Sequence, residues 1–350
     1  MLPYALIRPV LFALDAERAH NLALKALKLG LVPALGVKPD AALAVELFGL
    51  RFANPVGLAA GFDKNAEAVE AIARLGFGFV EVGSLTPKPQ AGNPKPRMFR
   101  LADDRAVINR LGFNNQGHAA ALQRLRGKRA KCVLGVNVGA NKDATDRMAD
   151  YALGLSTFND VADYLTVNIS SPNTPGLRTL QSRAELESLL ARIADTRAKI
   201  TDPKPVLLKI APDLEQAELE DIARLTESGA VDGIIISNTT ITRPEYLRAS
   251  NKGETGGLSG TPLFELSTRK LAALAQLTKL PLIGVGGVCD AETAWQKLRA
   301  GASLIQLYSA LTYGGPGLVA EILTGLAARL RREGFAHVSE VTGTGIADWS

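Results

Sequence analysis

The chain has 350 residues, of which 47% are hydrophobic and 21% are charged, and this ordinary globular composition excludes a disordered protein. The length fits about two average domains or one large α/β barrel. The net charge of +5 comes from scattered basic residues, which favours an acidic small molecule or an anionic membrane surface over nucleic acid as a partner. Two cysteines and three histidines are too few and too dispersed for a zinc site, so we expect no metal.

The sequence pattern of residues 1–45 predicts a small N-terminal extension of two amphipathic helices, over 3–14 and 15–29. Asp15 stands at the N-cap position of the second helix, and the first helix carries Arg8 as its only charge. Two interpretations remain open: the helices pack on the rest of the protein, or they lie in a membrane interface, where apolar area and basic side chains would hold them. We expect no signal peptide, because no small-residue cleavage site follows the apolar patch.

Eight short apolar runs then alternate with amphipathic segments, and most of the runs are continuously hydrophobic. Such runs are typical of parallel strands that are covered on both faces. Eight strand–helix repeats predict an α/β protein with a (β/α)8 TIM barrel over 46–337, followed by a frayed C-terminal tail over 338–350. The predicted strands cover 56–60, 79–83, 133–138, 164–169, 206–210, 233–237, 282–285 and 304–308, and the clearest helices cover 66–75, 183–200, 216–228, 262–277 and 291–300.

One connection in this series of alternating strands and helices is unusually long. Residues 86–107, after the second strand, are rich in proline, glycine and arginine. The stretch is too long for an ordinary strand-to-helix loop, so we expect either a functional loop or a small extra hairpin.

Barrel active sites form at the C-terminal ends of the strands, and here those ends carry amides, hydroxyls, lysines and glycines. Asp63 is the only carboxylate at a strand end, so the paired acids of a glycosidase are missing. The strand ends also lack the histidine of a serine triad and the oxygen anions of a divalent-metal site. Five asparagines stand at strand ends or in adjoining loops: Asn109, Asn137, Asn168, Asn173 and Asn238.

An asparagine side chain offers two donors and one acceptor, so it can match an imide edge or a carboxylate. Each one alone would be interpreted as a turn or strand-end residue. Together they favour a planar heterocycle that carries carbonyl groups, N–H groups and negative charge.

Glycines after the seventh strand (284–287), together with Tyr308 and Ser309, predict a phosphate site, and a loop over 256–260 adds further glycines. The glycine patterns of dinucleotide-binding and P-loop folds are absent from the sequence. Lys209 at the end of the fifth strand is a Schiff-base former, a fixed positive charge or a salt-bridged structural residue. We favour the fixed charge, because no acid–base partner is evident beside it.

Several motifs at these positions resemble the dihydroorotate dehydrogenase family, in order from about residue 3 to about residue 335. They are Ala-Ala-Gly-Phe-Asp-Lys-Asn (59–65), Asn-Arg-Leu-Gly-Phe-Asn-Asn (109–115), Asn-Ile-Ser-Ser-Pro-Asn-Thr-Pro-Gly-Leu-Arg (168–178), Lys-Ile-Ala-Pro-Asp (209–213), Ser-Asn-Thr-Thr (237–240) and Thr-Gly-Gly-Leu-Ser-Gly (255–260). The segment Ala-Glu-Arg-Ala-His (16–20) resembles the membrane-associated, quinone-reducing class 2 of bacterial type. Class 1 lacks this extension and uses a cysteine where this chain has Ser171.

The resemblance implies oxidation of (S)-dihydroorotate to orotate in pyrimidine (UMP) biosynthesis. Ser171 would remove a proton from C5 while a hydride passes from C6 to one FMN per chain, and electrons would continue to ubiquinone or menaquinone. Thr174 and a water near Phe113 would relay the proton, and Lys209 would stabilise the anionic reduced flavin. The resemblance also implies a monomer, bound peripherally through its N-terminal helices to the cytoplasmic face of a bacterial membrane.

The resemblance also implies residue contacts. Those for FMN are Ala60, Gly61, Lys64, Ser84, Asn137, Asn168, Lys209, Ser237, Gly260, Gly287, Tyr308 and Ser309. Those for dihydroorotate are Lys64, Asn109, Arg110, Leu111, Gly112, Phe113, Asn168, Asn173, Asn238 and Thr239. His20, Arg100 and Tyr308 are candidates for the quinone path, with packing or salt-bridge roles as the alternative.

Three other functions stay open at this point. A soluble flavin dehydrogenase could reduce fumarate or NAD in place of quinone. A flavin-free barrel isomerase or aldolase could use Lys209 as a Schiff-base former on a sugar phosphate. A non-catalytic, membrane-bound barrel is the third possibility.

Overall fold

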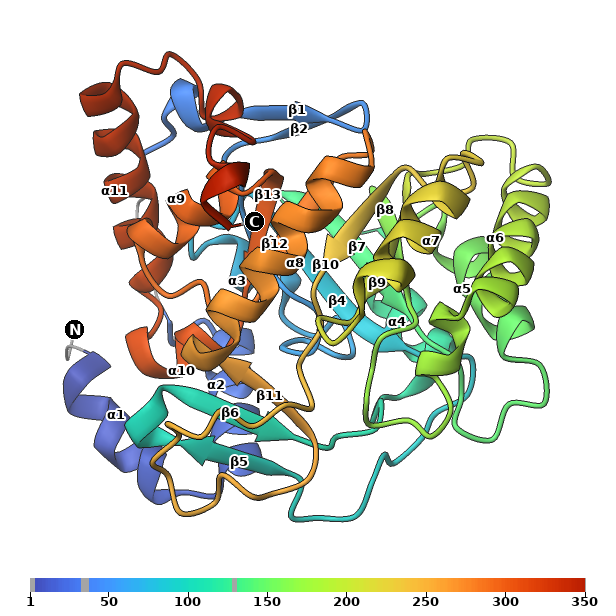
Figure 1. The fold of residues 1–350 in the computed structure, drawn as a ribbon. Helices are drawn as coiled ribbons and strands as arrows, with labels where there is room; N and C mark the ends of the chain where they lie inside the picture. The colour runs from blue at the N-terminus through green and yellow to red at the C-terminus, as the bar shows by residue number, and fades with distance from the viewer. Residues whose placement is uncertain (1–3, 33–37, 128–130, 350) are drawn as a thin grey trace.

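Eight parallel strands close into a barrel at the centre of the protein (Figure 1). The computed structural model describes residues 4–32, 38–127 and 131–349. Chain order is also the order around the barrel, and the last strand pairs with the first. The strands are β3 (Val56–Leu58), β4 (Phe79–Leu85), β7 (Val133–Val138), β8 (Tyr164–Asn168), β9 (Val206–Ile210), β10 (Gly233–Ile236), β12 (Leu282–Val285) and β13 (Ala302–Leu307). The predicted (β/α)8 barrel is confirmed.

Large rings fill the barrel interior at its N-terminal end. A Cβ atom on Gly57 would lie 2.3 Å from the ring of Phe79, and one on Gly135 would lie 2.1 Å from the ring of Tyr164. Glycine at these two positions therefore makes room for the two rings. The hairpin of β1 (Val45–Leu47) and β2 (Leu50–Phe52) covers this end, because Phe52 packs edge-on against Phe79 at 5.4 Å. A ligand site is thus confined to the opposite end of the strands.

Helices surround the barrel, and four of the five helices predicted from the sequence begin within two residues of the predicted start. They are α3 (Val69–Ala73), α4 (Gly117–Leu125), α5 (Arg147–Phe158), α6 (Arg183–Arg197), α7 (Gln216–Thr226), α8 (Phe264–Leu277), α9 (Ala291–Arg299), α10 (Ser309–Gly314) and α11 (Leu318–Glu333). The helix predicted over 66–75 is shorter than expected. The carboxylate of Asp63 accepts hydrogen bonds from the backbone N–H groups of Glu67 and Ala68, both at 2.8 Å, and so holds this segment as a loop.

The long connection after β4 forms the predicted extra hairpin. Its strands β5 (Met98–Leu101) and β6 (Ala106–Asn109) are antiparallel, and β11 (Gly257–Gly260) adds a third strand from a distant part of the chain. This small sheet has a separate apolar core, which includes Leu101, Ile108 and Leu258. In Figure 1 the sheet lies beside α1 and α10 at one end of the barrel.

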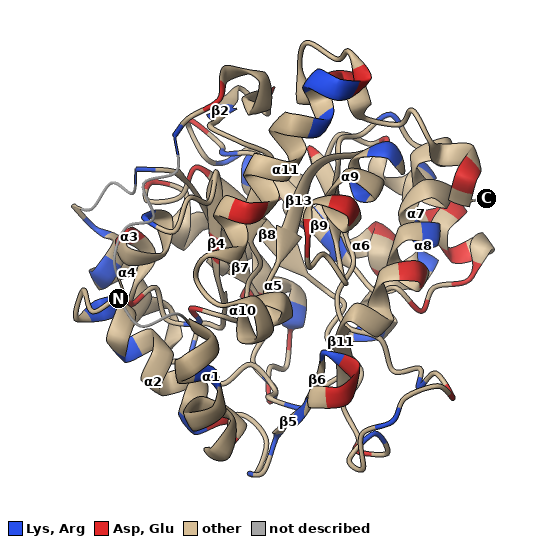
Figure 2. Ribbon diagram, turned by 90° about the vertical axis from the view of Figure 1, so that its left-hand side faces the viewer, with Lys and Arg blue, Asp and Glu red and all other residues tan. Residues whose placement is uncertain are grey.

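The N-terminal extension consists of α1 (Tyr4–Ala13) and α2 (Ala16–Lys28), with Asp15 capping α2 as predicted. The two helices differ in how they dock. α2 buries Ala19 and Leu27 against the protein, whereas α1 has no buried residue. Figure 2 shows few charged positions on α1. Within the described ranges, no helix has the length and apolar character needed to cross a membrane.

The C-terminal tail is packed, and the expectation of a frayed tail is wrong. Val338 and Val341 are buried, and the ring of Trp349 lies edge-on at 5.7 Å from that of Phe264 on α8. An ion pair of 2.7 Å between Arg299 and Asp348 holds the same segment to α9. The tail therefore belongs to the barrel's outer layer.

Candidate active site

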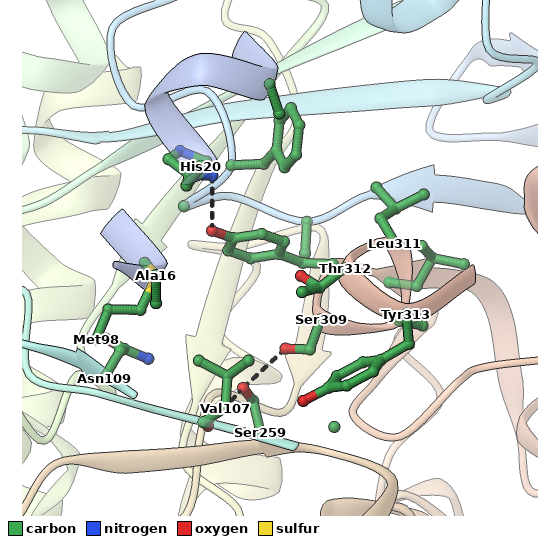
Figure 3. Close-up of a pocket in the computed structure, with 18 of the residues that line it drawn as sticks. Ala16, His20, Met98, Val107, Asn109, Ser259, Ser309, Leu311, Thr312 and Tyr313 are labelled. Carbon is green, nitrogen blue, oxygen red and sulfur yellow. Dashed lines mark hydrogen bonds between the residues drawn. The ribbon is translucent and has the colours of Figure 1, made fainter. Parts of the chain in front are cut away.

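A cavity of about 620 Å³ opens at the C-terminal ends of the barrel strands. The strand ends form one wall, the small sheet and α10 form another, and α1 and α2 form the third. Figure 3 shows residues of the second and third walls around this space, among them His20 of α2, Met98 of β5 and Ser309 of α10. The amide-rich strand ends and the apolar N-terminal helices therefore share one continuous cavity.

Most of the site residues expected from the sequence meet in this cavity. Those that line it are Ala60, Gly61, Lys64, Ser84, Asn109, Leu111, Gly112, Phe113, Asn168, Ser171, Asn173, Lys209, Ser237, Asn238, Thr239, Gly260, Gly287, Tyr308 and Ser309. Two expected residues, Asn137 and Arg110, are not part of its lining. Asn137 is fully buried below the cavity floor. Arg110 forms a 2.6 Å ion pair with Glu254 and stacks on Phe99, so its guanidinium points out of the cavity.

The asparagines contact one another across the strand ends. The side-chain amide of Asn168 donates to the hydroxyl of Ser84 at 2.9 Å, and that of Asn173 donates to Oδ1 of Asn109 at 3.2 Å. The amide of Asn238 donates to Oδ1 of Asn168 at 3.3 Å. These contacts gather donors and acceptors from β4, β6, β8 and the loop after β10 on one surface.

A buried carboxylate that we did not predict lies beneath this surface. Glu81 of β4 has no solvent exposure, and its carboxylate accepts hydrogen bonds from four side chains. Its partners are Asn137 at 2.8 Å, Tyr164 at 3.0 Å, Thr166 at 3.2 Å and Gln306 at 2.8 Å. The available signal was a single charged residue in the middle of an otherwise continuous apolar strand.

Two lysines give the cavity positive charge. Burial lowers the pKa of the Lys209 amine, and the carboxylate of Glu81 opposes this effect. Burial also lowers the pKa of Lys64 to about 8, while the carboxylate of Glu17 raises it in part. Lys209 of β9 is the register partner of Asn168 of β8. Both residues line the cavity, so Lys209 lies on the amide-lined wall.

The loop after β8 carries Ser171, which is nearly buried. Its hydroxyl oxygen accepts a hydrogen bond from the backbone N–H of Asn173 at 3.3 Å. Arg178 anchors this loop, because its guanidinium donates to the carbonyls of Ser170 at 3.0 Å and Thr239 at 2.9 Å. The same guanidinium pairs with Asp213 at 2.8 Å, so it joins the loops after β8, β9 and β10.

The glycine loops expected to bind phosphate lie together at another edge of the cavity. Gly260 and Gly287 have φ angles of 97° and 76°, which favour glycine. A Cβ atom on Gly287 would lie 2.3 Å from the Cβ of Phe264, so a side chain here is excluded. The hydroxyls of Ser259 and Ser309 lie 2.8 Å apart at the same edge (Figure 3). Backbone N–H groups and hydroxyls suit an anion.

His20, Tyr308 and Arg100, the candidates for a quinone path, line the part of the cavity next to the N-terminal helices. The hydroxyl of Tyr308 lies 3.3 Å from Nδ1 of His20, whose ring packs edge-on against Phe62 at 5.2 Å. Arg100 donates to the carbonyl oxygen of Leu11 at 2.8 Å and thereby holds α1 at the cavity.

The sequence also did not reveal what holds α2 in place. Glu17 of α2 and Arg97 are both buried and form two parallel hydrogen bonds of 2.7 and 3.0 Å. Such a paired arrangement is the strongest geometry for these two groups. Because the partners are 80 residues apart in sequence, neither local pattern indicates the contact.

The fold and the cavity define a barrel enzyme of the α/β class with its site at the strand ends and a helical extension over that site. The family model described as dihydroorotate dehydrogenase matches residues 42–330. A dihydroorotate dehydrogenase (quinone) from Parvibaculum lavamentivorans is 56% identical over 346 residues, which cover 98% of this chain and 99% of the relative. Another, from Brucella anthropi, is 54% identical and covers 98% of this chain and 96% of the relative.

Solved structures similar to this chain are also named dihydroorotate dehydrogenase. The ligand-free dihydroorotate dehydrogenase of Eimeria tenella superposes with a TM-score of 0.91 at 41% identity, covering 94% of this chain and 99% of that one. The complex of the Eimeria tenella enzyme with ferulenol gives a TM-score of 0.90, covering 94% of this chain and 95% of that one. This chain belongs to the dihydroorotate dehydrogenase family. The resemblance inferred from its motifs, including that to the quinone-dependent class, is confirmed.

Proposed function

We propose that this protein oxidises dihydroorotate to orotate in pyrimidine biosynthesis and passes the electrons through FMN to a quinone. One observation carries the proposal: a single cavity joins the amide-lined strand ends, with Ser171 and two lysines, to the apolar N-terminal helices. A substrate and a flavin would occupy the polar end, and a quinone would enter at the helical end. The protein is accordingly an oxidoreductase.

The residues present fit a flavin and a planar pyrimidine. The cavity volume of about 620 Å³ lies within the usual range for ligand sites, about 300–1,000 Å³. Oε1 of Gln306 and Oγ1 of Thr239 are buried without a hydrogen-bond partner in the described part of the chain, and both residues line the cavity. Buried polar atoms are normally paired, and both ring systems carry N–H donors. The glycine loops with Ser259 and Ser309 suit the phosphate group of FMN.

Bound FMN would supply the acceptor for the hydride that leaves C6 of dihydroorotate. Lys209 places positive charge beside the amide-lined wall, where negative charge develops during the transfer. Lys64 supplies an ammonium group for the substrate carboxylate, and Asn109, Asn173 and Asn238 supply amides for the imide edge of its ring. These side chains hold the substrate in one orientation, which removes much of the entropic cost of the reaction.

Ser171 is the group that removes the proton from C5. A serine hydroxyl is a weak base, so its own proton has to pass onward as it accepts one. The backbone N–H of Asn173 donates to its oxygen, which favours negative charge there. Thr174 is buried in the same loop and is the proposed next carrier, together with a water near Phe113.

The quinone, ubiquinone or menaquinone, would reach the cavity between α1 and α2 and contact His20, Arg100 and Tyr308. The exposed apolar residues of α1 and α2 would lie in the membrane interface, with Leu6, Val10 and Leu22 among them. These helices would bind the protein peripherally to the cytoplasmic face of a bacterial membrane, and a monomer would suffice for the reaction because one chain supplies the whole cavity.

Anaerobic mixing of the purified yellow protein with dihydroorotate tests the proposal. We expect the flavin absorbance to bleach, and we expect ubiquinone or menaquinone to restore it faster than fumarate or NAD does. A colourless protein would favour the flavin-free isomerase or aldolase. Bleaching that only fumarate or NAD reverses would exclude the quinone-reducing function.

A further inference from the structure

Glu81 is the starting point of a directed chain of hydrogen bonds. Its carboxylate is surrounded by side chains that donate to it, among them the NH₂ group of Asn137 at 2.8 Å and that of Gln306 at 2.8 Å. A carboxylate in this setting acts only as an acceptor. Asn137 therefore has to present its nitrogen to Glu81 and its oxygen to the opposite side.

The orientation of Asn137 determines that of the next amide. Its Oδ1 accepts hydrogen bonds from the hydroxyl of Ser84 and from the NH₂ group of Asn168, the latter at 3.3 Å. Oδ1 of Asn168 consequently faces the other way, where it accepts from the hydroxyl of Ser170 at 3.0 Å and the NH₂ group of Asn238 at 3.3 Å. We call Glu81, Asn137, Ser84, Asn168, Ser170 and Asn238 the amide relay.

We propose that Glu81 is a positioning residue that fixes the direction of the amide relay, and with it the donors and acceptors that the cavity presents. The proposal rests on the proposed function, because Asn168 and Asn238 would contact flavin and substrate. The nitrogen and oxygen of an asparagine amide are nearly equal in size, so its two orientations differ only in which atom donates. Glu81 is the acceptor-only group that sets the orientation of Asn137. The backbone N–H groups of Ser170 and Thr239 donate to Oδ1 of Asn168 at 3.3 Å and of Asn238 at 2.7 Å and support the same direction at the other end of the relay.

The relay ends in the loop after β8, next to Ser171. Ser170 directly precedes Ser171, and its hydroxyl receives a hydrogen bond from Asn238 at 3.0 Å while donating to Asn168. Oδ1 of Asn238 in turn accepts from the backbone N–H of Thr239 at 2.7 Å. A reversal that began at Glu81 would therefore change the donors and acceptors that Asn168 and Asn238 present to the cavity.

The Glu81→Gln variant tests the proposal. The new side chain can keep its oxygen toward Tyr164, Thr166 and Gln306, but its NH₂ group then meets the NH₂ group of Asn137. Turning over the Asn137 amide relieves this conflict but brings its NH₂ group to that of Asn168. The Asn168 amide then reverses as well and loses the hydrogen bond from the backbone N–H of Ser170. We expect the orotate Kd, measured from the change in flavin absorbance, to rise about tenfold or more, because polar groups of the site and ligand are left mismatched.

A double variant, Glu81→Gln with Asn137→Asp, is the matched control. It moves the carboxylate one link along the relay, where it accepts from the new glutamine on one side and from Ser84 and Asn168 on the other. Every downstream donor keeps its direction, so orotate affinity should return to near the parent value. Asn137→Asp alone places two carboxylates together and should bind orotate worse than the parent. A purely structural role for Glu81 would not predict rescue by the exchange.

Neutron diffraction of the deuterated protein provides a direct measurement, because deuterons distinguish amide nitrogen from oxygen. We expect the amides of Asn137 and Asn168 to be reversed in Glu81→Gln and restored in the double variant. Unchanged orotate affinity in Glu81→Gln, or a double variant that binds no better than Glu81→Gln, overturns the relay.

Two further outcomes separate the relay from the proposed function. If Glu81→Gln does not fold, the double variant must still fold and bind orotate, and its failure would also overturn the relay. A parent protein that binds neither flavin nor orotate would instead overturn the proposed function, and the amide orientations would then test the relay alone.

Discussion

The hydroxyl oxygen of Tyr308 lies 3.3 Å from Nδ1 of His20, and this contact joins the end of β13 to α2 across the cavity. It is the dashed line that starts at His20 in Figure 3. Burial lowers the pKa of His20 to about 3, and the nearby charge of Lys64 acts in the same direction. The imidazole is therefore neutral near pH 7, and its hydrogen bond with Tyr308 is one between two uncharged groups. The pair lies between the proposed flavin site and the proposed quinone entrance.

Replacing His20 should separate the two half-reactions. In His20→Leu we expect flavin reduction by dihydroorotate to stay close to the parent rate, since the polar end of the cavity is unchanged. Reoxidation by quinone should slow by roughly tenfold, the scale of losing one hydrogen bond at a reacting group. Stopped-flow measurements of each half-reaction check this, with His337→Leu, at an exposed position far along the chain, as the matched control. Equal slowing of both half-reactions would contradict a role confined to the quinone path.

Ser171 can be tested by removing its hydroxyl alone. Ser171→Ala should retain FMN and bind orotate, because among the described residues its hydroxyl forms a single hydrogen bond, from the Asn173 N–H at 3.3 Å. Flavin reduction should slow by about 10²- to 10⁴-fold, the usual contribution of a general base. Rapid anaerobic mixing measures this rate, and Ser188→Ala on the exposed face of α6 is the control. A reduction rate within a few-fold of the parent would remove Ser171 from the base role.

Lys64 should impose an upper pH limit on substrate capture. Burial lowers its pKa to about 8 in the free protein, so the ammonium form predominates below that pH and is lost as the pH rises through it. We expect kcat/KM for dihydroorotate to be level below the break and to fall by roughly tenfold per pH unit above it. Because kcat/KM reports the free enzyme, kcat should depend less on pH over this range.

The Lys64→Met variant identifies the group responsible for that limit. It should have a low kcat/KM that no longer shows the break. The control variant Lys279→Met, in the loop between α8 and β12, should behave like the parent. A break that persists unchanged in Lys64→Met would assign the titration to another residue.

Local sequence patterns predicted the barrel because each strand is a short apolar run that is buried on both faces, as in β7 and β9. Most of the residues expected at the site, from these patterns and from the family resemblance, line one cavity, since the ends of parallel strands meet at one edge of a barrel. Glu81 was missed because its partners come from β7, β8 and β13, and only barrel closure brings these strands around it. The packed tail was missed for a similar reason: Trp349 and Phe264 contact each other from positions far apart in the chain.

The exposed face of α1 offers a test of membrane attachment that leaves the site intact. Leu6 and Val10 are 61% and 66% exposed, and they lie one helical turn apart. Burial of one such side chain in an apolar environment is worth about 1.5–3 kcal/mol. The double variant Leu6→Glu with Val10→Glu should therefore weaken binding to anionic liposomes by tenfold or more, as measured by cosedimentation.

The same double variant should reduce flavin normally and should turn over a water-soluble short-chain quinone normally, because neither side chain lines the cavity. Its turnover with a long-chain quinone in liposomes should fall in parallel with binding. Leu153→Glu is the matched control, since Leu153 is also exposed, at 51%, but lies on α5. If Leu6→Glu with Val10→Glu binds liposomes as tightly as Leu153→Glu does, α1 is not the attachment surface, and the apolar residues of α2 remain as the other candidate.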